Sequence, residues 1–264
     1  MAALKIYVVF HKNIFRECYA DIPEEVFRKY ITCFAVNKEI KKEYDSWFGP
    51  SIVREYELEK YFPNLQEHRF CESSAYIHMF MNWDKLVEPY DFVGCVHYDM
   101  TIKASTLEYM MTTLNGVSNP FNTVFYFNKV CATDNLGSSF IVNHVEECLT
   151  HVGWRAVLDN YNEFFGTKHE YDSVVFDDMP LNHTFIIHKS LLARICPFFI
   201  SVLPKIREFL HHRIRHLPYM LESLWGFLLL LNKRENSTTR WVKIDIIHDE
   251  SLKDREFGLI RNTG

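Results

Sequence analysis

Histidines and carboxylates recur where apolar runs of the sequence give way to polar residues. The four places are His11-Lys12, His97-Tyr98-Asp99, Asn182-His183 and His248-Asp249-Glu250. A divalent ion that binds a diphosphate needs one or two carboxylates, sometimes helped by imidazole, with positions left for phosphate oxygens and water. These residue types therefore predict a metal-assisted reaction of a phosphate-bearing substrate.

His97 and Asp99 have the spacing best suited to sharing one ion. In an extended segment, residues i and i+2 point to the same side, so the two side chains can converge. The three-residue pattern is short and arises often by chance. Its place directly after an apolar run is what supports the metal prediction.

Two further sets of carboxylates are candidates for acid–base chemistry. Glu222 lies among Leu221, Leu224 and Trp225, and desolvation there would raise its pKa, as a general base requires. The alternative is an ordinary glutamate that faces solvent. Asp177-Asp178 forms a competing pair, for which a loop or a helix cap is the alternative.

The familiar phosphate-binding and nucleophile motifs are absent from the sequence. It contains no GxxxxGK[ST] loop, no GxGxxG fingerprint and no GxSxG elbow. Kinase, dinucleotide-binding and serine hydrolase functions therefore lose their main support.

The candidate residues need a sheet that brings strand ends together. Lys5–Phe10 and Asp91–His97 are nearly continuous apolar runs, typical of central parallel strands covered on both faces. Further strands are expected at 123–128, 139–143, 184–188 and 240–247, and helices at 23–34, 72–87, 190–201, 204–215 and 219–232, with Pro197, Pro204 and Pro218 punctuating the last three. This alternation predicts an α/β fold with a mostly parallel central sheet flanked by helices. In open sheets of this kind, ligands bind outside the carboxyl ends of the strands.

Composition narrows the classes of function. The 264 residues suit one large α/β domain, and a net charge of −5 argues against a nucleic-acid partner. Seven scattered cysteines indicate reduced thiols in a cytoplasmic protein. Residues 1–10 lack the features of a signal peptide, and the longest apolar stretch, Leu224–Leu231, is far below the roughly 20 residues that span a bilayer. We therefore expect no transmembrane segment.

The order of these pieces resembles the nucleotide-sugar glycosyltransferases of the GT-A fold. It is most similar to the capsular-polysaccharide type of bacteria and some large DNA viruses. The pieces that carry the resemblance are Lys5–Lys12, Glu72–Trp83, Asp91–Tyr98, Asn182–Lys189 and Pro218–Trp225. The resemblance implies a Rossmann-related single domain over 1–264, with a nucleotide-binding part at about 1–130 and an acceptor-side part at about 131–264.

The resemblance also implies roles for particular residues. Those expected at the donor are Val9, Phe10, His11, Lys12, Tyr76, His97, Tyr98 and Asn182. GT-A enzymes hold Mn²⁺ or Mg²⁺ on the diphosphate through an Asp-x-Asp motif. Here His97-Tyr98-Asp99 takes that place, so an imidazole replaces the first carboxylate, and His248 has the position of a histidine that completes the metal site. Glu222 is placed like the acid that faces the acceptor, with Asp177 or Asp178 as substitutes.

The predicted function is metal-assisted transfer of a sugar from a nucleoside-diphosphate sugar, a UDP-sugar first, to a hydroxyl of a glycan acceptor. Such a hexosyl- or pentosyltransferase would serve polysaccharide biosynthesis in the cytoplasm, or in the host cytoplasm if the protein is viral. One alternative is a non-catalytic module that binds a nucleotide or a sugar. The other is a metal-dependent phosphoesterase, which would need a denser carboxylate cluster than the sequence contains.

Overall fold

The computed structural model describes residues 2–36, 40, 52–67, 70, 72–130, 151–174, 179–209, 217–249, 251–252 and 255. Asp177, Asp178 and the strand expected at 139–143 lie outside the described residues.

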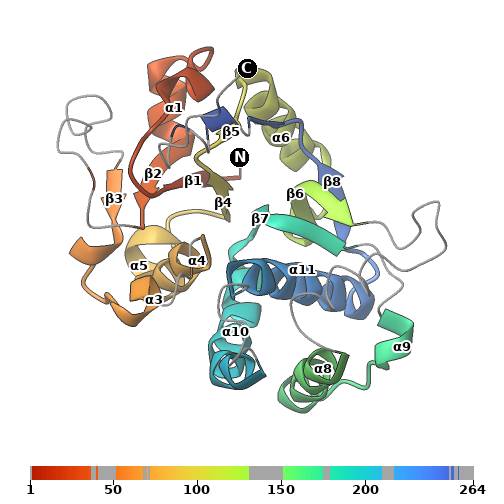
Figure 1. Ribbon diagram of the computed structural model, residues 1–264. Helices are drawn as coiled ribbons and strands as arrows, with labels where there is room; N and C mark the ends of the chain where they lie inside the picture. Colours follow the sequence, from red (N-terminus) through yellow and green to blue (C-terminus); the bar gives the residue numbers. More distant parts are fainter. Residues whose placement is uncertain are drawn as a thin grey trace, which may run out of the picture.

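A seven-stranded sheet forms the centre of the molecule (Figure 1), in the order β3-β2-β1-β4-β7-β6-β8. Its strands are β1 (Leu4–Phe10), β2 (Ile31–Ala35), β3 (Ile52–Arg54), β4 (Phe92–His97), β6 (Thr123–Val130), β7 (Met179–His188) and β8 (Arg240–Lys243). β7 is antiparallel to both of its neighbours, and the other pairs are parallel. The predicted mostly parallel sheet is confirmed, with the two apolar runs adjacent as β1 and β4.

Helices cover both faces of the sheet. They are α1 (Glu24–Tyr30), α3 (Asn64–Glu67), α4 (Glu72–Met81), α5 (Trp83–Leu86), α6 (Ala104–Gly116), α8 (His151–Phe165), α9 (Tyr171–Val174), α10 (Lys189–Phe209) and α11 (Leu217–Glu235), with short 3₁₀ turns at Arg16–Tyr19, Glu55–Glu57 and Pro120–Asn122. Figure 1 shows α4, α10 and α11 on one face and α1 and α6 on the other. Among the described residues, no helix is both long and apolar enough to cross a bilayer.

The strand β1 illustrates why the sheet is covered on both faces. All seven of its residues are buried. Tyr7 and Val9 belong to the core beneath α4, α10 and α11, whereas Ile6, Val8 and Phe10 belong to the core beneath α1 and α6. This alternation follows from the two-residue period of a strand, and it explains why the run is apolar except for Lys5.

A second, two-stranded sheet pairs β5 (Met100–Thr101) with β9 (Ile247–His248) in antiparallel register. The backbone N–H of Asp249 also donates to the carbonyl oxygen of Asp99, at 2.9 Å. Residues about 150 positions apart in the sequence therefore lie side by side just beyond the end of β4.

Several predicted boundaries were wrong, and β7 begins at Met179 rather than at the expected residue 184. The helix expected at 23–34 ends at Tyr30, and β2 begins at once, since Ile31 and Thr32 are β-branched and favour a strand. The single strand expected at 240–247 is split into β8 and β9. The helix expected at 72–87 is divided at Asn82 into α4 and α5.

The helix α10 passes through both prolines that were expected to interrupt it. A proline inside a helix costs about 3 kcal/mol or more. The buried side chains Phe198, Phe199 and Val202 offset that cost, because each contributes about 1.5–3 kcal/mol when it leaves water.

The helix α11 contacts β7 closely at Gly226. A Cβ atom at that position would lie 2.0 Å from the carbonyl oxygen of Pro180, a backbone atom that cannot move aside without shifting the strand. We expect Gly226→Ala to lower the free energy of unfolding by about 2–3 kcal/mol, as overpacking does. Urea unfolding measures this. The matched change Gly116→Ala, where a Cβ atom meets nothing within 4 Å, should leave stability unchanged or slightly higher. Equal effects of the two changes would contradict this close contact.

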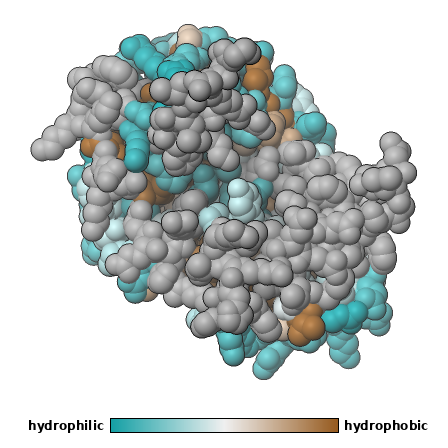
Figure 2. Space-filling view, in the orientation of Figure 1, coloured by the Kyte–Doolittle hydropathy of each residue, from teal (hydrophilic) through white to brown (hydrophobic). Residues whose placement is uncertain are grey.

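The described surface mixes hydrophilic and hydrophobic side chains. In Figure 2 the hydrophobic areas among the coloured residues are small and separated by hydrophilic ones. Exposed large hydrophobic side chains come from different helices, for example Tyr109 in α6, Phe164 in α8 and Tyr219 in α11. Single exposed residues of this kind are ordinary and do not by themselves indicate a binding site.

Candidate functional site

The carboxyl ends of β1 and β4 meet at one edge of the sheet. These strands are parallel neighbours, and β7 runs antiparallel to β4, so the first half of β7 reaches the same edge. His11 follows β1, His97 ends β4 and His183 lies in the first half of β7. Glu72, the first residue of α4, joins them.

Asp99 and His248 form one pair of functional groups at this edge. Nε2 of His248 lies 3.1 Å from Oδ2 of Asp99, while Oδ1 of Asp99 is buried without a hydrogen-bond partner among the described residues. Asp99 is 4% exposed, whereas the His248 side chain is about one third exposed. Leaving a buried carboxylate oxygen without a partner is costly, so such an atom indicates a place for a ligand, an ion or water.

Glu72, His97 and His183 form a second group. Each offers one ligand atom, and these three atoms lie within 4.8 Å of one another. Oε1 of Glu72 is 3.7 Å from Nδ1 of His97, and it is 4.0 Å from Nε2 of His11. Nε2 of His97 is buried and has no hydrogen-bond partner in the described part of the chain.

The protonation states within this second group follow from burial and from the neighbouring charges. Burial alone would raise the pKa of Glu72, but His97, His11 and His183 outweigh it and lower that pKa to about 2. Burial lowers the pKa of His183 to about 3, although Glu72 acts in the opposite direction. At neutral pH, Glu72 is therefore an anion and His183 a neutral imidazole.

Several contacts hold His183 in place. Oγ of Ser73 lies 2.7 Å from its Nε2, and the indole N–H of Trp225 donates to the same Oγ at 3.1 Å. His183 also has a positive φ of 45°, which is uncommon outside glycine and concentrates at functional positions. Residues from α4, β7 and α11 thus fix one imidazole at the edge of the sheet.

Tyr76 links the strands β4 and β7 through its hydroxyl group. Its hydroxyl accepts the backbone N–H of Cys95 in β4 and lies 3.0 and 3.1 Å from the carbonyl oxygens of His183 and Phe185 in β7. Its ring stacks on Phe185 and is fully buried. The sequence placed Tyr76 at the donor, whereas these contacts give it a positioning role for β4 and β7.

His97 and Asp99 do not share a group in the structure. His97 is the last residue of β4 and faces Glu72, whereas Asp99 lies in the turn that follows and faces His248. The rule that i and i+2 point to the same side holds only while the chain is extended, and the turn at Tyr98-Asp99 ends the extended segment. The two side chains therefore enter separate groups.

The other predicted donor residues surround this edge. Val9 and Phe10 are fully buried, so they offer only backbone atoms to a ligand, whereas the side chain of Lys12 is exposed. Tyr98 is buried, with its ring edge-on to His11 at 5.8 Å between centroids. Asn182 lies in β7, directly before His183.

Glu222 lies on α11, in the turn before the residues that contact the site. It is half-buried and precedes Trp225, the partner of Ser73, by three residues. Residues three apart on a helix are neighbours on its surface. Glu222 therefore lies beside Trp225 on the surface of α11.

Glu72 was not predicted from the sequence as a site residue. An acidic residue in the first turn of a helix is ordinary, because it interacts favourably with the helix dipole. Only the pairing of β1, β4 and β7 brings it to three histidines, and that pairing is not visible in the local pattern. Its place as the first residue of the resembling piece Glu72–Trp83 is the one signal that the sequence contains.

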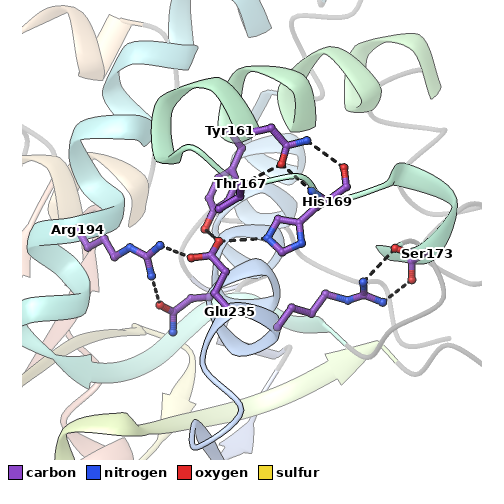
Figure 3. Close-up of polar contacts among 9 residues, drawn as sticks. Tyr161, Thr167, His169, Ser173, Arg194 and Glu235 are labelled. Atoms are coloured by element: carbon purple, nitrogen blue, oxygen red, sulfur yellow. Dashed lines mark hydrogen bonds and ion pairs between the residues drawn. The ribbon is translucent and has the colours of Figure 1, made fainter.

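A different polar cluster joins the helices α8, α10 and α11 (Figure 3). Glu235, at the end of α11, accepts hydrogen bonds from Tyr161 of α8 at 2.6 Å and from Arg194 of α10, and it contacts His169 at 3.1 Å. Arg194 also donates to Asn232, one turn earlier in α11. Because its members connect α8, α10 and α11, we interpret this cluster as one that stabilises the packing of these three helices.

Glu235→Gln is expected to lower the free energy of unfolding at pH 7 by about 1–3 kcal/mol, because a charged acceptor of several hydrogen bonds is lost. Burial raises the pKa of Glu235, but the hydrogen bonds from Tyr161, Arg194 and His169 outweigh it and keep the pKa low. A lowered pKa means that this stabilisation is present above the ordinary carboxyl pKa of 4.5 and is lost as the pH falls through the folded-state pKa. The difference between wild type and variant, measured by urea unfolding at a series of pH values, should therefore shrink in acid.

The matched control is Asp172→Asn. Asp172 makes an exposed ion pair with Arg155, so its loss should cost about 1 kcal/mol or less. A Glu235 variant as stable as this control would contradict the stabilising role of the Glu235 cluster.

Comparison with known proteins concerns the fold of the chain. No family model matches the sequence, and no curated protein matches it. Among solved structures, the chain is similar to the apo structure of WbbM, a bifunctional glycosyltransferase, with a TM-score of 0.61 and 14% sequence identity. The match covers 94% of this chain but only 45% of that one, so the chain spans less than half the length of WbbM. The predicted GT-A-like α/β fold, of the kind found in glycosyltransferases, is thereby confirmed.

Proposed function

We propose that this chain is a glycosyltransferase that moves a sugar from a nucleoside-diphosphate sugar to a hydroxyl of a glycan acceptor. The first candidate donor is a UDP-sugar. The observation that carries the proposal is Asp99, whose Oδ2 contacts His248 and whose buried Oδ1 has no hydrogen-bond partner among the described residues, at the carboxyl edge of the sheet. In open α/β sheets, ligands bind at this edge. The similarity of the fold to WbbM, a bifunctional glycosyltransferase, supports the reaction class.

The residues at Asp99 suit a divalent cation. One carboxylate oxygen has no hydrogen-bond partner in the part of the chain that the structure describes, and an imidazole that is partly exposed lies beside the other oxygen. Oxygen and imidazole ligands are those that Mn²⁺ accepts, and Mg²⁺ accepts the oxygen ligand. Asp99 and His248 would hold the ion, and a bound cation would neutralise negative charge on the leaving diphosphate.

The chain's own residues would share the remaining tasks. Backbone atoms of Val9 and Phe10, together with His11 and Lys12, would line the nucleotide, since they end and follow β1. Glu222 would accept the proton of the acceptor hydroxyl in an inverting reaction, or would orient the sugar in a retaining one. Its half-buried place on the side of α11 next to Trp225 supports this role.

Calorimetric titration with UDP, in the presence and absence of Mn²⁺, tests the proposal. We expect binding that Mn²⁺ strengthens in wild type and no longer strengthens in Asp99→Asn. Binding that ignores Mn²⁺ would remove the metal from the scheme and leave a metal-free transferase or a nucleotide-binding module. If the folded protein binds neither UDP nor other nucleoside diphosphates, the proposal is wrong.

A further inference from the structure

We propose that Glu72, His97 and His183 form a binding site for a divalent transition-metal ion. Zn²⁺ is the first candidate ion, and the site is separate from Asp99 and His248. The proposal goes beyond the glycosyltransferase function, because metal binding at this site needs neither a donor nor an acceptor. It begins from the convergence of three potential ligand atoms within 4.8 Å of one another.

The spacing is close to that of a coordinated ion. Bonds of about 2.0–2.1 Å in a tetrahedral site place neighbouring ligand atoms about 3.4 Å apart. Nδ1 of His97 and Oε1 of Glu72 are already 3.7 Å apart. The remaining separations need to shorten by at most about 1.4 Å, which small rotations of side chains provide.

The ligand types determine the class of ion. Two imidazoles and one carboxylate form the set found in many catalytic zinc sites, which keep one position open for water or substrate. Imidazole nitrogen suits Zn²⁺, Co²⁺ and related ions, whereas Mg²⁺ and Ca²⁺ prefer oxygen alone. This set therefore selects a transition metal, and its open position would accept an oxygen atom.

The burial and the orientation of Glu72, His97 and His183 favour binding of a cation. Glu72 and His183 are 7% and 2% exposed, and a carboxylate buried among imidazoles has few polar partners other than a cation. At His97, Nδ1 faces Glu72 and is the nitrogen that would bind the ion, while Nε2 is buried without a hydrogen-bond partner among the described residues.

A second layer of contacts holds the ligands, as is usual in metal sites. Ser73 contacts a ring nitrogen of His183 and is itself held by the indole of Trp225. The hydroxyl of Tyr76 lies within hydrogen-bond distance of the backbone carbonyl of His183. Outer partners of this kind fix the orientation of a ligating histidine, and their loss weakens metal binding by about 10–100-fold.

The two candidate sites are distinct in the described part of the chain. His97 faces Glu72, whereas Asp99 faces His248, and neither Asp99 nor His248 belongs to the three-residue group. A variant that removes one site therefore leaves the ligands of the other in place, which allows separate tests.

Titration with Zn²⁺ and Co²⁺ tests the site, with the full chain stripped of metal and the double variant Asp99→Asn/His248→Gln as background. We expect this background to bind one equivalent of Zn²⁺ by calorimetry and to give the intense visible absorption of low-coordinate Co²⁺. Adding Glu72→Gln should remove both signals. Adding Ser73→Ala should weaken Zn²⁺ binding by about 10–100-fold while keeping one equivalent.

The matched control is Glu24→Gln, which removes the same charge from an exposed position on α1. It should bind Zn²⁺ as the background does. Failure of the background to bind Zn²⁺ or Co²⁺, or unchanged binding after Glu72→Gln, would overturn the site. If Glu72→Gln does not fold, Ser73→Ala decides: unchanged affinity then rejects the site. None of these results depends on turnover of a nucleotide sugar, so the failure of either proposal is recognisable separately.

Discussion

Asp99→Asn is expected to lower sugar transfer by about 10³-fold, with the fold and thermal stability preserved. The change keeps the size of the side chain and removes the charge beside His248. A carboxylate that holds the metal ion on the leaving diphosphate contributes several kcal/mol to the stability of the transition state, and each 1.36 kcal/mol corresponds to about a tenfold change in rate. Steady-state release of the nucleoside diphosphate, measured with saturating donor, gives the comparison.

Asp245→Asn is the control for this change. Asp245 lies three residues before His248, is exposed and uses its backbone carbonyl to accept the hydroxyl of Thr106. Its substitution should leave turnover within about twofold, as surface changes away from a site usually do. Near-normal turnover in folded Asp99→Asn would show that Asp99 is not at the diphosphate.

Glu222→Gln is expected to lower kcat by roughly 10²–10⁴-fold while nearly preserving binding of the donor. Loss of a general base removes proton transfer, whereas an amide of the same shape keeps the local packing. In wild type, turnover should fall at acid pH as the base is protonated, and this acid limb should be absent from the residual activity of the variant.

Glu208→Gln, an exposed position on α10, serves as the matched change and should behave as wild type. If Glu222→Gln retains both its rate and the acid limb, Glu222 is a surface glutamate. The acid on the acceptor side would then be sought at Asp177 or Asp178, with the transferase proposal unchanged.

The parts of the fold that were predictable are those in which one physical pattern dominates. β1 and β4 are buried on both faces, so their sequences are almost wholly apolar, and their ends were located within one residue. Boundaries failed where two patterns compete. No breaker separates Tyr30 from Ile31, and tertiary packing keeps Pro197 and Pro204 inside α10.

The candidate site was predictable only in part, for a related reason. Polar residues that follow buried strands led to His11, His97, Asp99 and His248, and the structure brings Asp99 to His248. Glu72 has no such signal, because it begins a helix and reaches the histidines only through the tertiary arrangement. The turn after β4, which separates Asp99 from His97, also depends on pairing with β9.

The most direct test of the transferase account is cleavage of a nucleotide sugar by the purified chain. UDP-, GDP- and dTDP-sugars are incubated with wild type, Asp99→Asn and Glu222→Gln, with and without oligosaccharide acceptors. The released nucleotide and the extended glycan are then followed by chromatography and mass spectrometry. The account predicts that wild type cleaves at least one UDP-sugar, that an acceptor accelerates this cleavage, and that both variants are strongly impaired. A folded wild-type protein that cleaves none of these donors, or variants that cleave them at the wild-type rate, would contradict it.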